Sequence, residues 1–462
     1  MNELNFLTVD LFLYDLCDAL GRDTKKVEEI RQQFWQRLYP DLNGRKPTNV
    51  KETTAYFADY VELLDKRYKK LSDKVDGYYY PVQLGDTYAL LVDSSGEKAS
   101  PQSVNSPKAV NAISTDILQN HIDRKRGNLG ESWLIWGQLT DSTQDVEATA
   151  KACYYALPSE QKPNWDQDQN PLGKGTFCGA TLYELQQLDT YLDGKNNSHH
   201  VLICLFPSEQ NQTQIKETIG KLHRHLIRLF LYRSKVMWLY EWSRHLKSSL
   251  KEASEKLDHS GFALSASVKA PKINLKELQQ QLSSALINSN NYKQRLGFLR
   301  EKEPEISTNL ISYCDRLARM KITDDQADLA FLNHFVTLTK DKYLRQIQAD
   351  TAAFESALKT LDSFIQTVQG ITDIERTHNE RVLNQTVAIA GVGISVASLA
   401  ASSLSNQADA IIQSWRPIPK GQPPSVLNLS LSAALIFFVS IAIGGLAALI
   451  TSAFISKTKS SS

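Results

Sequence analysis

Two long apolar runs near the C-terminus constrain the fold more than any other feature of the sequence. Residues 387–404 and 431–455 contain no Asp, Glu, Lys, Arg or His. At about 1.5 Å per helical residue they would extend about 27 Å and about 37 Å, and the hydrocarbon core of a bilayer is about 30 Å thick. The sequence therefore predicts two transmembrane helices and a lipid bilayer as partner. The alternative, two buried helices of a soluble core, is disfavoured because uncharged runs of this length rarely occur so close together in soluble domains.

Basic residues around the two runs predict the orientation of the chain. More of them lie outside the pair than in the connecting loop: Arg376, Arg381, Lys457 and Lys459 outside, Arg416 and Lys420 inside the loop. Cytoplasmic flanks of membrane helices are enriched in Lys and Arg. The N-terminus has no basic region before an apolar stretch, so no secretory signal is predicted. We expect an integral membrane protein with both termini in the cytoplasm.

The remaining composition is that of a globular protein in a reducing compartment. The chain is 42% hydrophobic and 22% charged, with a formal net charge of +1. A near-neutral chain argues against a nucleic-acid partner bound by bulk electrostatics. The five cysteines are widely spaced and form no Cys-x-x-Cys, which predicts neither a disulfide framework nor a zinc site.

Apolar spacing divides the rest of the chain into an α/β domain and a helical stalk. Residues 4–72 have helical spacing, and strands alternate with helices after them. The strands are predicted at 79–84, 88–92, 133–139, 176–184 and 200–206, with a hairpin turn at Gly85-Asp86 and a helix at 146–156. This pattern predicts an α/β domain over residues 1–208.

Residues 209–386 are predicted to form the stalk. Helices are expected at 215–257, 275–299, 306–320 and from 325 onward; the first carries too many charges for a membrane span. The last helix has coiled-coil spacing at Phe354, Leu358, Leu361, Ile365 and Val368, which predicts packing within a subunit or around a symmetry axis. With residues 387–462 as a transmembrane hairpin, the predicted fold class is α+β.

Small residues in the first predicted span suggest two alternative roles. One stripe contains Asn384, Gly391, Ser395, Ser398, Ser402 and Asn406, and a neighbouring stripe contains Gly393, Ala397 and Ala401. Small residues four apart let membrane helices approach closely, and Gly444 and Gly445 of the second span offer a matching surface. Both stripes could pack on the second span, or the serine stripe could line a pore.

The other candidate motifs are better explained by solvent exposure or by a structural role than by ligand binding. The Walker spacing is absent around Gly173-Lys174-Gly175-Thr176, and Asp166 and Asp168 fit a solvated turn better than a cation site. His223 and His225 should point to different helix faces as polar-face residues, and the pair at 199–200 should be a solvated strand end. No catalytic arrangement stands out, so an enzyme is not predicted. No cofactor is predicted either, and a divalent cation stays open.

A cytoplasmic α/β domain, a long stalk entering the membrane and a second span with a short basic tail together resemble the CorA-type magnesium transporter superfamily. The resemblance is to the plan of the chain, centred on residues 375–404 and 431–459. It implies a homo-oligomer, a pentamer in that family, whose first spans line a central pore. The family's Gly-Met-Asn is absent after the first span, where the chain has Ser405-Asn406-Gln407. The resemblance therefore implies the architecture without the magnesium selectivity.

Three functions fit these features. The first is a homo-oligomeric, CorA-like channel or transporter-like protein with a cytoplasmic regulatory domain. The second is a membrane-anchored sensor or effector, in stress or defence. The third is a membrane scaffold without ion transport.

Overall fold

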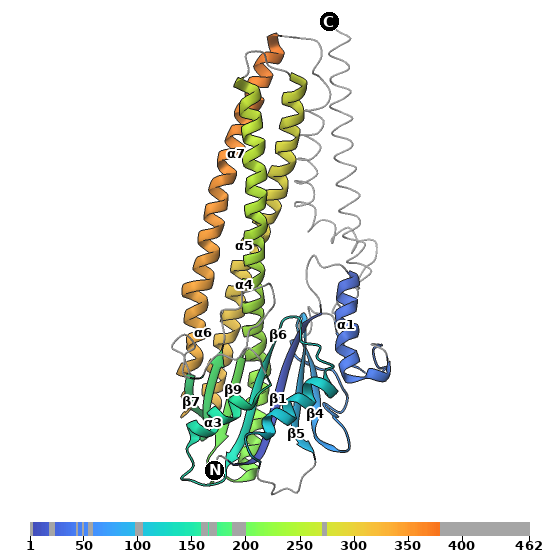
Figure 1. Cartoon of the computed structure of the whole chain (residues 1–462), viewed down its shortest axis with the longest axis vertical. Coiled ribbons are helices and arrows are strands. Elements are labelled where there is room, and N and C mark those ends of the chain that lie inside the picture. The colour runs from blue at the N-terminus through green and yellow to red at the C-terminus, as the bar shows by residue number, and fades with distance from the viewer. Residues whose placement is uncertain are drawn as a thin grey trace, which may run out of the picture. The chain divides into compact units, whose positions relative to one another are not determined.

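A computed structural model describes residues 3–17, 24–42, 45–48, 50–53, 59–97, 105–158, 165, 173–186, 200–269 and 275–378. The chain divides into two compact units. Unit 1 comprises Met1–Ser248 and Leu296–Ala352, and unit 2 comprises Ser249–Arg295 and Ala353–Ser462. A mixed sheet in the N-terminal part and long helices after it make an α+β fold, as predicted (Figure 1).

Nine strands of the described residues form one sheet in unit 1, in the order β2-β4-β5-β1-β6-β9-β8-β7, with β3 also paired to β4. Neighbours are antiparallel except β6 and β9, which are parallel. The strands are β1 (Leu4–Leu16), β2 (Val61–Glu62), β3 (Lys69–Lys70), β4 (Val75–Leu84), β5 (Thr87–Glu97), β6 (Gly130–Leu139), β7 (Gly173–Phe177), β8 (Ala180–Gln186) and β9 (His200–Phe206).

Short helices connect the strands. Long helices, with short helical segments between the last two, follow the sheet. The first group is α1 (Thr24–Leu38), η1 (Pro40–Leu42), α2 (Ala109–Asp116), the π-helical turn η3 (Ile117–His121) and α3 (Val146–Ala156). The second group is α4 (Gln212–Lys269), α5 (Leu275–Thr323), η4 (Ala330–Leu332), α6 (Asn333–Leu338), the π-helical turn η5 (Thr339–Leu344) and α7 (Arg345–His378).

Side chains of the central strand β1 alternate between two buried layers. Val9, Leu11 and Leu13 belong to the core that also holds residues of α1, α2 and α3. Successive side chains of a strand point to opposite faces, so Phe12 and its alternating neighbours lie on the other face. There α4 covers the sheet: the ring of Phe12 meets Phe230 edge-on at 5.2 Å.

The helical prediction for residues 4–16 is wrong, because this segment is β1. A central strand with both faces covered is apolar on both sides, which removes the alternation that would have identified it. Val61–Glu62, also predicted as helix, forms β2. Lys69–Lys70, at the end of the same predicted helical region, forms β3. Among the described residues of this region, α1 confirms the helix prediction.

Other predicted elements of the sheet domain are confirmed. These are the β4–β5 hairpin, in which Gly85 has a φ of 58°, and the segments β6, α3 and β9. The single strand predicted at 176–184 is instead the hairpin β7–β8, whose turn holds Cys178 and Gly179 at positive φ.

The two helices predicted at 275–299 and 306–320 are one helix, α5, with Pro304 inside it. Proline removes one backbone hydrogen bond of a helix but does not always end it. In unit 2, α5 and α7 contact each other where the Tyr292 hydroxyl donates to the carbonyl oxygen of Phe354 at 3.0 Å. Ile365 and Val368 of the predicted seam are buried.

The predicted membrane spans lie outside the described residues. Among the described helices, none is both long and apolar enough to cross a bilayer.

Candidate functional site

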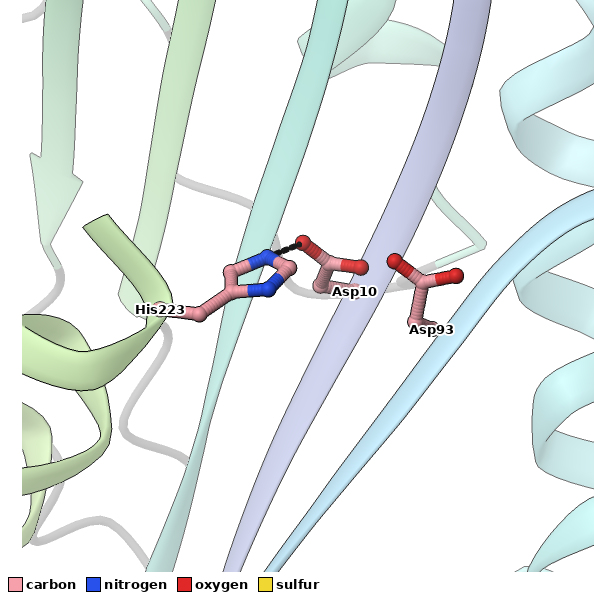
Figure 2. A group of neighbouring side chains, drawn as sticks. All are labelled: Asp10, Asp93 and His223. Atoms are coloured by element: carbon pink, nitrogen blue, oxygen red, sulfur yellow. Dashed lines mark hydrogen bonds and ion pairs between the residues drawn. The ribbon is translucent and has the colours of Figure 1, made fainter. Parts of the chain in front are cut away.

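Asp10, Asp93 and His223 meet on the face of the sheet that α4 covers (Figure 2). Asp10 lies on β1, Asp93 on β5 and His223 on α4. Asp10 and Asp93 are direct partners in the antiparallel ladder, so their side chains emerge side by side on one face. Their exposed fractions are 0% and 8%, and that of His223 is 7%.

Hydrogen bonds orient the histidine of this cluster. The Nε2 atom of His223 lies 2.7 Å from Oδ2 of Asp10. Its Nδ1 atom lies 3.4 Å from the hydroxyl of Tyr78, which is the ladder partner of Asp93. One potential ligand atom from each of Asp10, Asp93 and His223 lies within 4.8 Å of the other two.

Burial shifts the ionisation of all three groups toward their neutral forms. It raises the pKa of Asp10 to about 8 and the pKa of Asp93 well above its usual value, where the charge of Asp10 adds to the effect. Burial also lowers the pKa of His223 to about 4. The cluster therefore contains a neutral imidazole and a carboxyl pair that retains protons at neutral pH.

Two buried polar atoms of the cluster make no hydrogen bond of standard geometry among the described residues: Oδ1 of Asp10 and Nε1 of Trp136. The side chains still interact, because contacts with Trp136 and Asp93 lower the pKa of Asp10 and partly oppose the effect of burial.

A cavity of about 600 Å³ opens beside the cluster and is lined by Asp93, His223 and Trp136, among others. Four cationic side chains also line it: Arg67, Lys70, Lys216 and Arg224. Arg67 forms an ion pair with Glu62 at 2.8 Å. The aromatic part of the lining comes from Tyr68, Tyr78, Tyr80 and Trp136.

Two glycines give the cavity its shape. A Cβ on Gly77 would lie 2.2 Å from the carbonyl oxygen of Asp93, so the close approach of β4 and β5 requires glycine there. A Cβ on Gly220 would meet no atom within 4 Å. Gly220 lies one helical turn before His223, and both line the cavity.

The prediction that His223 and His225 point to different helix faces is confirmed, but the prediction that His223 lies on a polar face is wrong. His223 points into the sheet domain, whereas Nε2 of His225 lies 3.1 Å from Oγ1 of Thr323. Spacing of two residues separates their directions on a helix but does not say which face is covered.

The prediction of a solvated strand end is wrong for His200. Its side chain is buried, with Nδ1 at 2.8 Å from Oγ of Ser132 and Nε2 at 2.9 Å from Oε1 of Glu184. The reason is that β9 lies between β6 and β8 and that Phe230 of α4 covers the ring.

The glycines of the Gly173-Lys174-Gly175-Thr176 segment have a packing role. They lie in β7, where a Cβ on Gly173 would come 2.7 Å from the ring of Phe331 and a Cβ on Gly175 would come 2.1 Å from the carbonyl oxygen of Asp328. The segment is a strand and not a phosphate-binding loop.

The predicted membrane residues and the acidic turn lie outside the described residues. This holds for the proposed pore-lining set, for both sets of small packing residues, and for Asp166 and Asp168.

Comparison with protein-family models, curated proteins and solved structures found no match to this chain. The resemblance to the CorA-type superfamily therefore rests on the plan of the sequence alone.

Sequence reasoning missed the cluster because it assigned Asp10 to a helix and ended the β5 strand at Val92. The signal available in the sequence was a pair of carboxylates, Asp10 and Asp15, inside a largely apolar segment. Charged residues are rarely buried unless they are paired or bind a ligand.

Proposed function

We propose that the protein is a membrane-anchored sensor whose sheet domain binds a small phosphorylated ligand. The observation that carries this proposal is the cavity, which combines a cationic lining with aromatic walls. Its volume is in the range of small-molecule sites, about 300 to 1,000 Å³. Lys and Arg side chains bind phosphate groups, and the tyrosine and tryptophan rings offer stacking surfaces for a planar group.

The lining comes from both the sheet and α4, which supports a signalling role. Arg67, Lys70 and Asp93 belong to the sheet or its connections, whereas Lys216 and Arg224 belong to α4. A ligand that contacts both would favour conformations in which α4 is held against the sheet. Because α4 is continuous to Lys269, it belongs to both unit 1 and unit 2.

The membrane anchor in this proposal is the hairpin of residues 387–404 and 431–455, with residues 1–385 and the C-terminal tail in the cytoplasm. Its support is the absence of charged residues from both runs and the basic residues that flank them. The last described helix, α7, ends at His378, shortly before the first run.

A homo-oligomeric, CorA-like channel is the second candidate. The serine stripe of the first run, with Ser395 and Ser398, favours it because hydroxyls tolerate a hydrated path. Replacing Ser398 by Leu would then abolish ion flux through reconstituted protein, whereas Leu399→Ile would not. If the wild-type protein conducts no ions either with or without bound ligand, the channel is contradicted and the sensor remains the proposed function.

Ligand binding is tested with the full chain in detergent and with ATP, inorganic phosphate and adenosine as probes, in the presence of a chelator. We expect ATP to raise the unfolding temperature and adenosine to have no effect. The double variant Lys216→Ala/Arg224→Ala should lose at least tenfold in ATP affinity, which corresponds to about 1.4 kcal/mol.

Lys221→Ala is the matched control, because Lys221 is exposed on α4 but is not among the cavity-lining residues. An equal loss of ATP affinity in this variant would mean that only bulk charge is sensed. No binding of either phosphorylated probe, or equal binding of adenosine, would contradict the proposal.

A further inference from the structure

We propose that Asp10, Asp93 and His223 bind one divalent cation of the Mn²⁺ and Zn²⁺ class beside the cavity. The site deepens the proposed function, because a cation there would also bind a phosphate group of the ligand. Cation binding itself does not depend on that ligand.

The geometry fits a single ion held by three separate elements. One ligand atom from each of the three residues lies within 4.8 Å of the other two. Metal–ligand distances of about 2.0 to 2.2 Å place neighbouring donor atoms about 3 Å or more apart. The 2.7 Å contact between Asp10 and His223 would therefore open slightly as the ion enters.

The burial of the cluster favours a bound cation over three side chains that contact only one another. Two carboxyls that face each other across a buried ladder repel when they are ionised, and a positive charge between them removes that cost. Oδ1 of Asp10 is buried and has no hydrogen-bond partner among the described residues. Figure 2 shows this second oxygen of Asp10 on the side toward Asp93.

The donor set selects the kind of metal. Imidazole nitrogen suits first-row transition metals such as Zn²⁺, and carboxylate oxygen suits Mn²⁺ as well as Mg²⁺ and Ca²⁺. A mixed set of one nitrogen and two carboxylates therefore favours Mn²⁺ or Zn²⁺ over Ca²⁺. Tyr78 beside Nδ1 of His223 provides the outer contact that leaves Nε2 as the ligand atom.

The open side of the site would face the cavity. Asp93 and His223 line the cavity, whereas Asp10 lies behind them and is not part of its lining. Coordination positions left by the three protein ligands would thus point to the space that Lys216 and Arg224 also line. Trp136 lines the same space.

The test uses chelator-stripped full-length protein in detergent, titrated with Mn²⁺ alone and followed by electron paramagnetic resonance. We expect one tightly bound Mn²⁺ per chain, with nitrogen coupling from the imidazole in the pulsed spectrum. Asp93→Asn and His223→Gln should each weaken Mn²⁺ binding at least tenfold, and His223→Gln should remove the nitrogen coupling. Asp59→Asn should change neither, because Asp59 is an exposed carboxylate that is not among the cavity-lining residues.

Wild-type protein that binds no more Mn²⁺ or Zn²⁺ than Asp93→Asn would overturn the inference, as would nitrogen coupling that persists in His223→Gln. Should one variant fail to fold, Zn²⁺ provides a second readout. Zn²⁺ should raise the unfolding temperature of the wild type and of Asp59→Asn, and an unchanged temperature counts against the site.

The two proposals fail separately. Mn²⁺ binding without ATP binding supports the cation site and contradicts the proposed ligand. ATP binding that is equally strong with chelator and with Mn²⁺, in protein that retains no Mn²⁺, supports the ligand and contradicts the cation site.

Discussion

Asp10 on β1 and Asp93 on β5 are direct ladder partners, and both side chains are buried on the face that α4 covers. Like charges directly opposite each other destabilise a sheet. Burial raises the pKa of both carboxyls, so the pair avoids this repulsion by retaining protons at neutral pH. A bound cation would let both carboxyls ionise.

We predict that Asp93→Asn raises the stability of metal-free protein at neutral pH. The amide removes one ionisable group from a buried site and can donate a hydrogen bond to Oδ1 of Asp10. The expected gain in the free energy of unfolding is about 1 to 2 kcal/mol. Denaturant unfolding in chelator measures it, and Asp59→Asn should stay within about 0.5 kcal/mol of the wild type. A clear loss of stability in Asp93→Asn would show that the Asp93 carboxyl itself stabilises the fold.

A second prediction concerns His200, whose pKa burial lowers to about 4, with Arg233 adding to the effect and Glu184 opposing it. Above about pH 6.5 the imidazole is neutral in both states, but as pH falls the unfolded chain takes up a proton before the folded one. The contribution of His200 to stability should therefore fall between about pH 6.5 and pH 4, by about 3 kcal/mol in total.

His200→Gln tests this pH dependence. The variant should be less stable at pH 7.5, because it disturbs the contacts to Ser132 and Glu184, yet it should lose less stability than the wild type on going to pH 5. Denaturant unfolding at the two pH values measures the difference. Equal losses in variant and wild type would assign the acid sensitivity to other groups.

The contact between β7 and Phe331 yields a third prediction. Gly173→Ala places a methyl group 2.7 Å from the Phe331 side chain, and overpacking of this kind costs about 1 to 3 kcal/mol. Phe331→Ala in the same chain should recover part of that loss. It should rescue Gly175→Ala less, because there a Cβ would meet the backbone oxygen of Asp328 at 2.1 Å as well as the Phe331 ring at 2.5 Å. Double-mutant cycles of each glycine variant with Phe331→Ala, measured by thermal unfolding, compare the two rescues. Equal rescue at both glycines would contradict the described packing of β7.

Some of the fold was predictable because local patterns agreed with the final environment. Helix α3 begins after Asp145, whose side chain accepts hydrogen bonds from the backbone N–H groups of Glu147 and Ala148, and its bounds match the prediction. Strand β1 was missed because α4, which packs on the face carrying Asp10, lies more than 200 positions later in the sequence. The environments of His200 and His223 depend on the same long-range packing. Neither could follow from local spacing.

A fourth prediction tests the seam of α7 in unit 2. Ile365 and Val368 are buried, so Ile365→Asp/Val368→Asp would bury unpaired charge at a cost of several kcal/mol. The expected result is a lower unfolding temperature with loss of helical circular dichroism. Thr367→Asp, on an exposed position of the same helix, is the control and should behave as wild type. A double variant as stable as this control would mean that the seam is not buried in the protein.

The most direct test of the central claim, a ligand site between the sheet and α4, is calorimetric titration of ATP into Gly220→Met and wild-type protein. A side chain at position 220 would enter space in which a Cβ meets no atom within 4 Å, on the wall of the cavity. Methionine is also a better helix former than glycine, so the variant should fold at least as well. We predict that the wild type binds ATP and that Gly220→Met loses at least tenfold in affinity while its unfolding temperature is unchanged or higher. Unchanged ATP affinity in a folded Gly220→Met protein would contradict the site.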